Sequence, residues 1–596
     1  MAVTIPFWIA LIFSLVLVPL ARNVSLRLGI VDVPKGDRWH SKPTPKVGGI
    51  AIFFAFAISI SSAVFYTPSF DFPWALIIGS IITFFVGVID DYRSLTPASK
   101  IVGQIVAAAL VVFFGRNLEF FDLEILNILF TFVWLIGITN AINLLDNMDG
   151  LAGGVALIAA LILSLMFWQV QAVNLLIIAL GLGGAVLGFL FFNFPPATVF
   201  MGDAGSLFLG FTLASLAIAQ VPRASNLLSI LGVPTLIFLL PILDTAMVTI
   251  TRILRGQSPT IGGKDHTSHR LIAFGLSERQ TVIALYGVAF VAGILGSFLE
   301  SIDYNISLLL IPIFLVVFTL LTAYLARIKV VKNLDAQPQS SAFSRLIMGL
   351  SGRGRVLEII LDSVIICVAY YLSFWLFYGE NFNTLGLDNF LRTLPIVIAS
   401  AYISFFVLGI YRRIWQYIGL KDLLRFVLAV FGSAFTYRVF ILLLYPGDDF
   451  PWSIIFLYAI FLFFGLASSR VSFRLLDQIY IQKNRSKQQS ISVVIYAADD
   501  AGVMALNWLL NHPSIHYDVI GFLDDDPYKK GRQIQGITVI GNLNDLSTII
   551  EKYDFQGIVF PSEDVVKVFK DSKAFDICHE RGMWLKLLQI NFESIE

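Results

Sequence analysis

Polar side chains gather in a few short stretches of an otherwise apolar chain. Asp90 and Asp91 end the apolar run FFVGVIDDYR, and Lys100 follows soon after. Three further stretches are NAINLLDNMDG (140–150), NFPPATVFMGDAGS (193–206) and SPTIGGKDHTSHRL (258–271). Carboxylates, amides, a lysine and an arginine together suit a magnesium pyrophosphate, because Mg²⁺ prefers hard oxygen ligands and Lys and Arg neutralise phosphate charge. We therefore expect phosphoryl chemistry where these stretches meet.

Each stretch also has a purely structural explanation. Asp90 and Asp91 could end a solvated helix, NLLDNMDG could form an Asx-rich turn, and MGDAGS could cap the next helix. The histidine pair of HTSHR is of a kind more often found on surfaces than in catalysis. Independent explanations would scatter the polar stretches over both faces of the protein, whereas all of them fall in loops on one predicted face. That convergence favours a shared function.

The composition is that of a membrane protein. Of 596 residues, 57% are hydrophobic and 14% are charged, and apolar runs long enough to cross a bilayer recur along the chain. Lys and Arg together number 41, and Asp and Glu together also number 41, so the net charge gives no indication of a nucleic-acid partner. The distant Cys367 and Cys578 exclude a disulfide framework. The N-terminal segment lacks a basic region and a cleavage site, and we interpret it as a retained first span.

About eleven spans are expected before residue 327. They are 5–21, 47–66, 73–89, 101–114, 124–140, 151–169, 172–192, 206–221, 227–250, 281–300 and 305–326. Lys and Arg are concentrated in the odd-numbered loops, so the positive-inside rule places these loops in the cytoplasm and the N-terminus outside. Every polar stretch described above lies in an odd-numbered loop.

The second half begins with a basic linker, 327–355, rich in Ser, Gly and Gln. Four more spans are expected at 356–378, 391–411, 424–445 and 452–469. From about residue 488 the segments ISVVIYA, YDVIGFLDD, TVIGN and QGIVFP are typical of short buried strands separated by helices. This alternation predicts an α/β domain with a parallel sheet.

The predicted fold class is therefore a polytopic α-helical membrane protein, with about 11 + 4 transmembrane helices, followed by a cytoplasmic α/β Rossmann-like domain. The expected domains are a polytopic domain at 1–326, the linker at 327–355, a four-span membrane domain at 356–487 and the Rossmann-like domain at 488–596.

With these motifs the chain resembles the polyprenyl-phosphate N-acetylhexosamine-1-phosphate transferase superfamily over residues 1–326. Five motifs occur in order: VDVPKGDRWHSKPTPKVGG, the Asp pair with its following Lys, NAINLLDNMDGLA, NFPPATVFMGDAGS and the His-containing loop. The resemblance implies transfer of a HexNAc 1-phosphate from a UDP-sugar to undecaprenyl phosphate, with release of UMP. It further implies Mg²⁺ as cofactor, with Mn²⁺ as the alternative, and a site at the cytoplasmic face of the inner (plasma) membrane.

The resemblance also implies roles for individual residues. Asp203 would be a metal ligand and Asn143 a second one; Asp149 would contact the uracil and Lys100 the pyrophosphate. His269 and Arg270 would hold the pyrophosphate or the sugar, and Asp90 would lie nearest the attacking lipid phosphate. The full expected set comprises catalytic Asp90, Asp91, Lys100, His266, His269 and Arg270, substrate-binding Asn140, Asp146, Asp149, Lys100 and Arg270, and metal-binding Asp203 and Asn143.

Two positions depart from the pattern of the superfamily. Asn147 stands where a glycine is usual, and Ser268 stands where a histidine is often found. The triple histidine of enzymes that use the muramyl-pentapeptide nucleotide is absent, which favours a smaller UDP-HexNAc as donor. A single in-line displacement is the preferred mechanism, and attack by an aspartate through a covalent intermediate stays open as the competing route.

Residues 356–590 resemble the N-terminal half of membrane-bound nucleotide-sugar dehydratases and epimerases, through VVIYAADDAG and YDVIGFLDDDPYKKGRQIQGITVIGN. A dinucleotide-binding turn needs several glycines, but here only Gly502 is present, and Asp499 and Asp500 would repel phosphate. A scaffold or docking role without catalytic activity is therefore expected for this domain. Docking of sugar-modifying enzymes and homodimerisation through the C-terminal half are both left open.

Two other classes of function compete with this one for the whole chain. A transporter or flippase of lipid-linked sugars would carry acids in mid-span or two related halves with broken helices, and neither is evident. A non-catalytic scaffold would not need Asp90, Asp91, Asn143, Asp149 and Asp203 all to be intact.

Overall fold

The structure is a computed structural model that describes most of the chain. The described residues are 2–31, 43–67, 70–114, 123–219, 227–254, 263, 265–299, 316–317, 319–320, 322–324, 355–382, 386–412, 420–446, 450–485, 491–510 and 517–588. The chain forms two compact units, Met1–Arg474 and Leu475–Glu596. The expected linker lies outside the described residues except for its last residue, and so do His40 and most of the expected span at 305–326.

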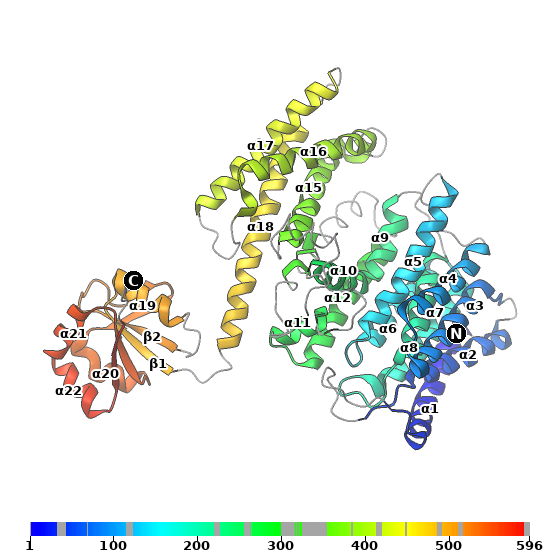
Figure 1. The fold of residues 1–596 in the computed structure, drawn as a ribbon, viewed down its shortest axis with the longest axis horizontal. Helices are drawn as coiled ribbons and strands as arrows, with labels where there is room; N and C mark the ends of the chain where they lie inside the picture. Colours follow the sequence, from blue (N-terminus) through cyan, green and yellow to red (C-terminus); the bar gives the residue numbers. More distant parts are fainter. Residues whose placement is uncertain are drawn as a thin grey trace, which may run out of the picture. The chain divides into compact units, whose positions relative to one another are not determined.

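The first unit is built of long apolar helices (Figure 1). Its first eight are α1 (Ile5–Leu28), α2 (Gly48–Tyr66), α3 (Trp74–Arg93), α4 (Pro97–Phe113), α5 (Glu124–Leu145), α6 (Leu151–Gln169), α7 (Val173–Asn193) and α8 (Gly202–Ile218). Within the described residues, eleven helices are long and apolar enough to cross a membrane. The helices α4 and α8 are shorter apolar helices. The expectation of a polytopic helical membrane protein is confirmed.

Helix α8 lies at the centre of this group of helices. Nearly all of its side chains are buried, and it packs against α2, α3, α5 and α6. A helix that is apolar on every side is stable only when other helices cover it all round. Its first turn is therefore surrounded by the ends of its neighbours, and these ends carry the polar stretches noted in the sequence.

The chain direction brings four helix ends to one end of the group. Helices α3 and α5 finish at Arg93 and Leu145, whereas α4 and α8 begin at Pro97 and Gly202. Thr96 caps α4 by accepting a hydrogen bond from the backbone N–H of Ser99, which is a common way for a helix to start. Residues of all four ends can therefore share one site.

The expected ninth span, 227–250, is two helices in the structure. One residue, Phe238, separates the end of helix α9 (Leu227–Ile237) from the start of α10 (Leu239–Leu254). Pro241 has no backbone N–H to donate to the carbonyl of Ile237, and its ring opposes a continuous helix at that point. Beyond this break lie α11 (Thr267–Ala273) and α12 (Glu278–Leu299).

Four further helices follow along the chain: α15 (Arg355–Tyr378), α16 (Leu387–Val407), α17 (Leu420–Leu444) and α18 (Trp452–Arg485). A buried ion pair joins the first and last of them. Arg470 donates from both terminal nitrogens to the two carboxylate oxygens of Asp362, at 2.5 and 2.7 Å. The hydroxyl of Tyr411 donates to the same carboxylate at 3.0 Å. An ion pair satisfied in this way ties α15 to α18 away from water.

The second unit contains a six-stranded sheet in the order β3-β4-β2-β1-β5-β6. Its strands are β1 (Ile491–Tyr496), β2 (Tyr517–Leu523), β3 (Gln533–Ile534), β4 (Ile537–Gly541), β5 (Gly557–Phe560) and β6 (Trp584–Leu587). The four strands expected from the sequence are present and parallel. The sequence did not indicate β3, which pairs antiparallel with β4, or β6.

Helices cover both faces of this sheet (Figure 1). Val493 and Ile495 pack on one face with α19 (Asp500–Leu510), while Val494 and Tyr496 pack on the other. That second face is covered by α20 (Leu546–Lys552), α21 (Glu563–Lys570) and α22 (Lys573–Glu580). Successive residues of a strand point to opposite faces, so β1 is apolar on both. The α/β prediction is confirmed.

Candidate active site

The two adjacent acids of α3 make different contacts. Both carboxylate oxygens of Asp91 accept backbone N–H groups at the start of α8, from Asp203 and Ala204, each at 2.9 Å. Asp90 forms an ion pair with Lys100 and accepts the N–H of Leu95 at 2.6 Å. Asp91 therefore caps a helix through Asp203, which lies 112 residues later in the sequence, while Asp90 faces the basic side chain of α4.

Asp203 is the residue on which the site converges. Lys100 donates to its Oδ2 at 2.8 Å, and the Asn143 amide donates to its Oδ1 at 2.8 Å. The same amide nitrogen donates to Ser206 Oγ at 2.7 Å, one turn further along α8. Side chains from α3, α4, α5 and α8 thus form one connected network around a single carboxylate.

This network keeps Asp203 ionised. Burial alone would raise the pKa of Asp203, but its hydrogen bonds with the side chains of Asp90 and Lys100 outweigh that effect. The Lys100 charge and the Asn143 amide act in the same direction, so the pKa lies below its ordinary value. Asp203 precedes the span expected at 206–221 and carries a negative charge at this end of the group of helices.

Glycines allow the start of α8 to approach its neighbours closely. Gly202 has a φ of 72°, and a side-chain carbon there would lie 2.6 Å from Oδ2 of Asp91. Gly49, in the motif at 31–49, has no room for a side chain because the backbone of Gly205 lies against it. Its N–H donates to the carbonyl of Met201 at 2.8 Å. The described part of the first motif therefore holds the FMGDAGS turn in place.

The turn between α5 and α6 lies beside this network. Asp149 accepts the N–H of Ala197 at 2.8 Å, and the next residue, Gly150, donates its N–H to Asn193 at 3.0 Å. Burial raises the pKa of Asp146 to about 7, and the charges of Asp203 and Asp91 add to the shift. The turn is thus held rigidly by its neighbours and brings two more acids to the same end of the helices.

Asn140 has a different environment from the one expected of a substrate-binding residue. Its amide forms a reciprocal pair with Gln104, at 2.7 and 3.3 Å, and also donates to the carbonyl of Ile136 at 2.8 Å. Gln104 and Asn140 lie one turn deeper than Lys100 and Asn143 on the same two helices. Asn140 therefore fastens α4 to α5 beneath the network.

A second cluster surrounds α11. The Nδ1 of His266 lies 2.8 Å from Asp244 Oδ2, and the N–H of Thr267 donates to Asp244 Oδ1 at 2.6 Å. The His266 and His269 rings lie edge to face, with centroids 6.1 Å apart. The Nε of Arg270 donates to the carbonyl of Asp265 at 2.8 Å. All three expected residues of this loop, His266, His269 and Arg270, are buried together.

Arg252 fixes the base of the second cluster. It donates from two nitrogens to the carboxylate of Asp265, at 2.7 and 3.0 Å. Burial would raise the pKa of Asp265, but the hydrogen bonds and charge of Arg252 outweigh burial and hold the pKa below its ordinary value. The loop that carries the histidines is therefore anchored by a bidentate ion pair.

The structure thus brings Asp90, Asp91, Lys100, Asn143 and Asp203 into one network, with Asp146 and Asp149 beside it, and places His266, His269 and Arg270 in a second cluster. The sequence did not single out Asn193, Ser206 or Asp265, which are short polar residues without a distinctive pattern of their own. Asp244 does carry a signal in the sequence, because an acid within an apolar segment needs a partner for its charge.

The residues present fit a divalent cation. Asp90 and Asp203 both point at one cationic atom, Lys100 Nζ, so their oxygens already converge on a positive charge. In the part of the chain that the structure describes, no group of three or more His, Cys, Asp or Glu side chains is placed to hold a metal. Mg²⁺ commonly takes only one or two carboxylates and completes its shell with phosphate and water, so the smaller set is sufficient.

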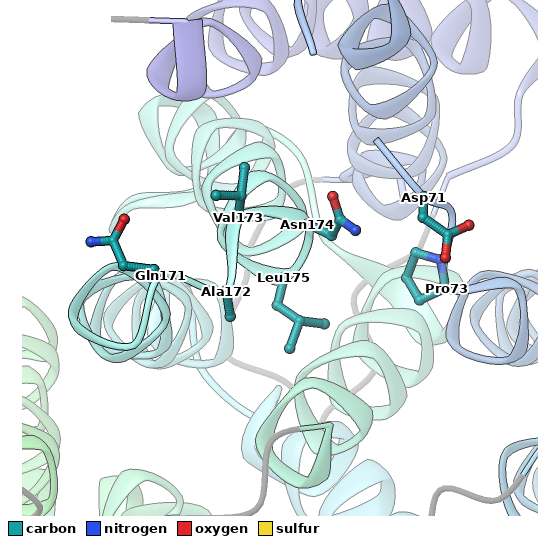
Figure 2. Close-up of a pocket in the computed structure, with 7 residues that line it drawn as sticks. All are labelled: Asp71, Pro73, Gln171, Ala172, Val173, Asn174 and Leu175. Carbon is teal, nitrogen blue, oxygen red and sulfur yellow. The ribbon is translucent and has the colours of Figure 1, made fainter. Parts of the chain in front are cut away.

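A pocket of about 460 Å³ lies elsewhere, lined by residues of the 71–73 and 171–175 segments (Figure 2). These segments precede α3 and join α6 to α7, whereas the network lies at the other ends of α3 and α6. Figure 2 shows Asp71, Asn174 and Gln171 around it, with aliphatic side chains between them. Among the described residues that line this pocket, Asp71 carries a charge and no Lys or Arg accompanies it, so we assign the pocket no part in the reaction.

Comparison with known proteins gives two family matches. Residues 73–221 match the model for glycosyl transferase family 4, and residues 397–559 match the model for a CoA-binding domain. The first match includes Asp90, Asp91, Lys100, Asn143 and Asp203.

Individual relatives agree with the first match. A probable undecaprenyl-phosphate N-acetylglucosaminyl 1-phosphate transferase of Bacillus subtilis is 32% identical over 58% of this chain and 97% of its own length. A decaprenyl-phosphate N-acetylglucosaminephosphotransferase of Mycolicibacterium smegmatis is 32% identical over 44% and 74%. A phospho-N-acetylmuramoyl-pentapeptide-transferase of Anoxybacillus flavithermus is 29% identical over 49% and 95%.

Proposed function

The chain belongs to glycosyl transferase family 4, and on that premise we propose that it transfers an N-acetylhexosamine 1-phosphate from a UDP-sugar to undecaprenyl phosphate. The products are undecaprenyl diphosphate-sugar and UMP, and the reaction begins the synthesis of a cell-surface glycan. The relatives named above are phosphotransferases that act on a prenyl phosphate or on a muramoyl-pentapeptide.

One observation carries the proposal. Lys100, Asn143 and Asp203, from three helices, meet at the end of a bundle of apolar helices. An enzyme that joins a membrane-anchored phosphate to a water-soluble donor needs its charged groups at such an end, because neither substrate can reach charges in mid-bilayer. We place this end at the cytoplasmic face of the inner membrane, since Lys and Arg are concentrated in the loops there.

The reaction we propose is a single in-line displacement. An oxygen of the lipid phosphate bonds to the β-phosphorus of the donor, and the bond from that phosphorus to the bridging oxygen breaks, so that UMP leaves with the oxygen. Lys100 neutralises charge on the pyrophosphate, and Asp90 orients the acceptor phosphate by way of Lys100. Asp203, with Asn143 as second ligand, would hold Mg²⁺, which would supply charge neutralisation at the pyrophosphate.

A general base is not needed for this attack. A phosphate monoester has a second pKa of about 6, so the lipid phosphate is largely dianionic at neutral pH. The competing route begins with attack by an aspartate and passes through a covalent intermediate. A glycosyl-phosphoryl enzyme trapped in the absence of acceptor would overturn the single displacement in favour of the covalent route.

The donor we propose is a UDP-HexNAc smaller than the muramyl-pentapeptide nucleotide. The chain lacks three consecutive histidines in its last loop, where it reads HTSHR. Two of the relatives named above transfer an N-acetylglucosamine 1-phosphate by their names. A panel of UDP-sugars resolves the donor, with UMP release as the readout.

The experiment that tests the function measures UMP released by the purified full chain in detergent. UDP-GlcNAc and related donors are supplied with and without undecaprenyl phosphate, and with Mg²⁺, with Mn²⁺ or with EDTA. We expect release only when donor, lipid phosphate and metal are all present. Metal-independent release, or no release with any UDP-HexNAc, would contradict the proposal. A transporter or a scaffold would release no UMP under any of these conditions.

For the second half we propose a scaffold role in place of nucleotide chemistry. In the turn after β1, the N–H of Ala498 donates to Asp524 at 2.8 Å and that of Gly502 to Asp499 at 2.8 Å. These donors would have to bind phosphate in a dinucleotide site, and here the chain's own carboxylates accept from them. Titration of the full chain with NAD, CoA and UDP-GlcNAc tests this. Micromolar NAD or CoA binding that is lost on removing residues 488–596 would contradict it.

A further inference from the structure

A hydrogen bond joins the two clusters of the site. The hydroxyl of Ser268, in α11, donates to Asn147 Oδ1, in the α5–α6 turn, at 2.6 Å. The two residues are 121 positions apart in the sequence. They are also the two positions at which this chain departs from the pattern of the superfamily it resembles. Both departures therefore lie in one contact.

Asn147 is held firmly on its own side of the contact. Its Nδ2 donates to the carbonyl of Leu144 at 2.9 Å, which leaves Oδ1 aimed across at Ser268. The turn that it belongs to carries Asp146 and Asp149, and Asp149 is itself fixed by the N–H of Ala197. The acceptor atom is thus part of a turn with little freedom to move.

Ser268 is equally constrained on the other side. It is 1% exposed, and its neighbours His269 and Arg270 are buried with it. Helix α11 has only seven residues, so its orientation depends on contacts such as those of Thr267 with Asp244 and of Ser268 with Asn147. A shift of α11 that moves the Ser268 hydroxyl also moves His269 and Arg270, because the three are consecutive residues of that helix.

The volumes of the two side chains are coupled as well. A histidine at position 268 would need space that Asn147 now fills, because buried interiors are close-packed. A glycine at position 147 would open that space and would leave the Ser268 hydroxyl without its acceptor. Asparagine at 147 therefore fits with serine at 268, and glycine at 147 fits with histidine at 268. Asparagine with histidine would be too large for the contact, and glycine with serine would leave space in it.

We propose that the Asn147–Ser268 contact is a clasp that sets the position of His269 and Arg270 relative to the Asp146–Asp149 turn, and thereby determines how the nucleotide-sugar donor is held. The inference rests on the proposed function, because it concerns the donor site of that reaction. Asn147 and Ser268 are positioning residues. The lipid acceptor, which meets Asp90 and Lys100 in the other cluster, does not depend on the clasp.

The test is a double-mutant cycle in the full chain. Asn147→Gly and Ser268→His are each expected to raise the donor KM by ~10-fold or more, and the double variant to return it to within ~3-fold of wild type, as coupled contacts do. The KM for undecaprenyl phosphate is expected to stay unchanged in all three variants. A general loss of folding would lower the maximal rate and leave both KM values unchanged.

A second set of variants makes smaller changes of volume. Ser268→Ala is expected to raise the donor KM, and Ser268→Thr, which keeps the hydroxyl, to restore it. Ser164→Ala is the matched control, because Ser164 is also buried and its hydroxyl donates to the carbonyl of Ala160, away from the site. Its two KM values are expected to match those of wild type.

The outcomes separate the clasp from the function itself. A wild-type chain that releases no UMP with any UDP-sugar overturns the proposed function. An active wild type in which Asn147→Gly and Ser268→His are additive, or in which the acceptor KM rises as much as the donor KM, overturns the clasp alone.

Discussion

Lys100 Nζ lies 2.8 Å from Oδ2 of Asp203, although 103 residues separate the two in the sequence. Lys100 is in the first turn of α4 and Asp203 is in the first turn of α8, so the contact exists only because both helices begin at the same end of the bundle. The ammonium group also pairs with Asp90. One cation thus stands between two carboxylates that would otherwise repel each other and any anionic substrate.

Removing the Lys100 charge is expected to impair catalysis more than folding. Lys100→Gln would leave the pyrophosphate without its nearest basic side chain, and kcat for UMP release should fall by ~10²–10³-fold, as when one preorganised donor is lost. Asp71→Asn is the control, since Asp71 is an exposed carboxylate-bearing residue at the far end of α3. Near-normal kcat in Lys100→Gln would show that this lysine has no role in the reaction.

Metal removal is expected to abolish activity reversibly. EDTA should stop UMP release by the wild-type chain, and added Mg²⁺ should restore it, because we propose that Asp203 and Asn143, which share a hydrogen bond in the network, hold the metal. Asp203→Asn should raise the Mg²⁺ concentration for half-maximal activity by at least ~10-fold. The measurement is a Mg²⁺ titration of UMP release for both chains. An unchanged half-maximal concentration in Asp203→Asn would assign the metal to other residues.

Asp91 is expected to act through the backbone it caps. Asp91→Ala removes the acceptor for the N–H groups of Asp203 and Ala204, which should destabilise the protein by about 0.5–2 kcal/mol, as the loss of a helix cap does. The displaced Asp203 should also weaken the response to Mg²⁺. Thermal unfolding in detergent and the Mg²⁺ titration measure the two effects. A variant with lower kcat but unchanged stability and Mg²⁺ response would point to direct catalysis by Asp91.

The sequence was a good guide to the helices and to the polar stretches that meet. Long apolar runs predict spans, and the position of Asp90, Lys100 and Asp203 at span ends predicted that they would share one end of the bundle. The strands of the second unit followed from short β-branched runs such as ISVVIY. These features depend on local composition, which a sequence displays directly.

Pairings between distant side chains could not be predicted in the same way. Nothing in the sequence distinguishes Asp91, which caps α8, from Asp90, which faces Lys100, because the difference arises from a rotation of about 100° between neighbours on a helix. The contact of Asn147 with Ser268 depends on how a turn and a short helix pack. Tertiary packing decides such contacts, and local patterns carry no record of it.

The Asp362–Arg470 pair is expected to stabilise the packing of α15 on α18. A pair of apolar side chains is expected to replace it with little loss of stability. Arg470→Met would leave a buried carboxylate without its partner and should destabilise the protein by about 3–5 kcal/mol. The double variant Asp362→Leu with Arg470→Met removes both charges and should recover most of the loss. Thermal unfolding in detergent measures both. A double variant no more stable than Arg470→Met would contradict this explanation.

The stability of the second unit is expected to fall at acid pH through Asp524. Burial would raise the pKa of Asp524, but the ion pair with Lys529 and the N–H groups of Asp526 and Ala498 outweigh burial and hold the pKa below its ordinary value. A group with a depressed folded pKa contributes stability above its unfolded pKa of about 3.9. That contribution is lost as the pH falls through the folded value.

Urea unfolding of residues 475–596 at a series of pH values from 7 to below 4 measures this loss. In Asp524→Asn the free energy of unfolding should be lower at pH 7 and should depend less steeply on pH below about 4, because an amide has no proton to gain in that range. Asp518→Asn, at an exposed position on β2, is the control and should follow the wild-type curve. Parallel curves for wild type and Asp524→Asn would mean that the carboxylate of Asp524 does not stabilise the turn after β1.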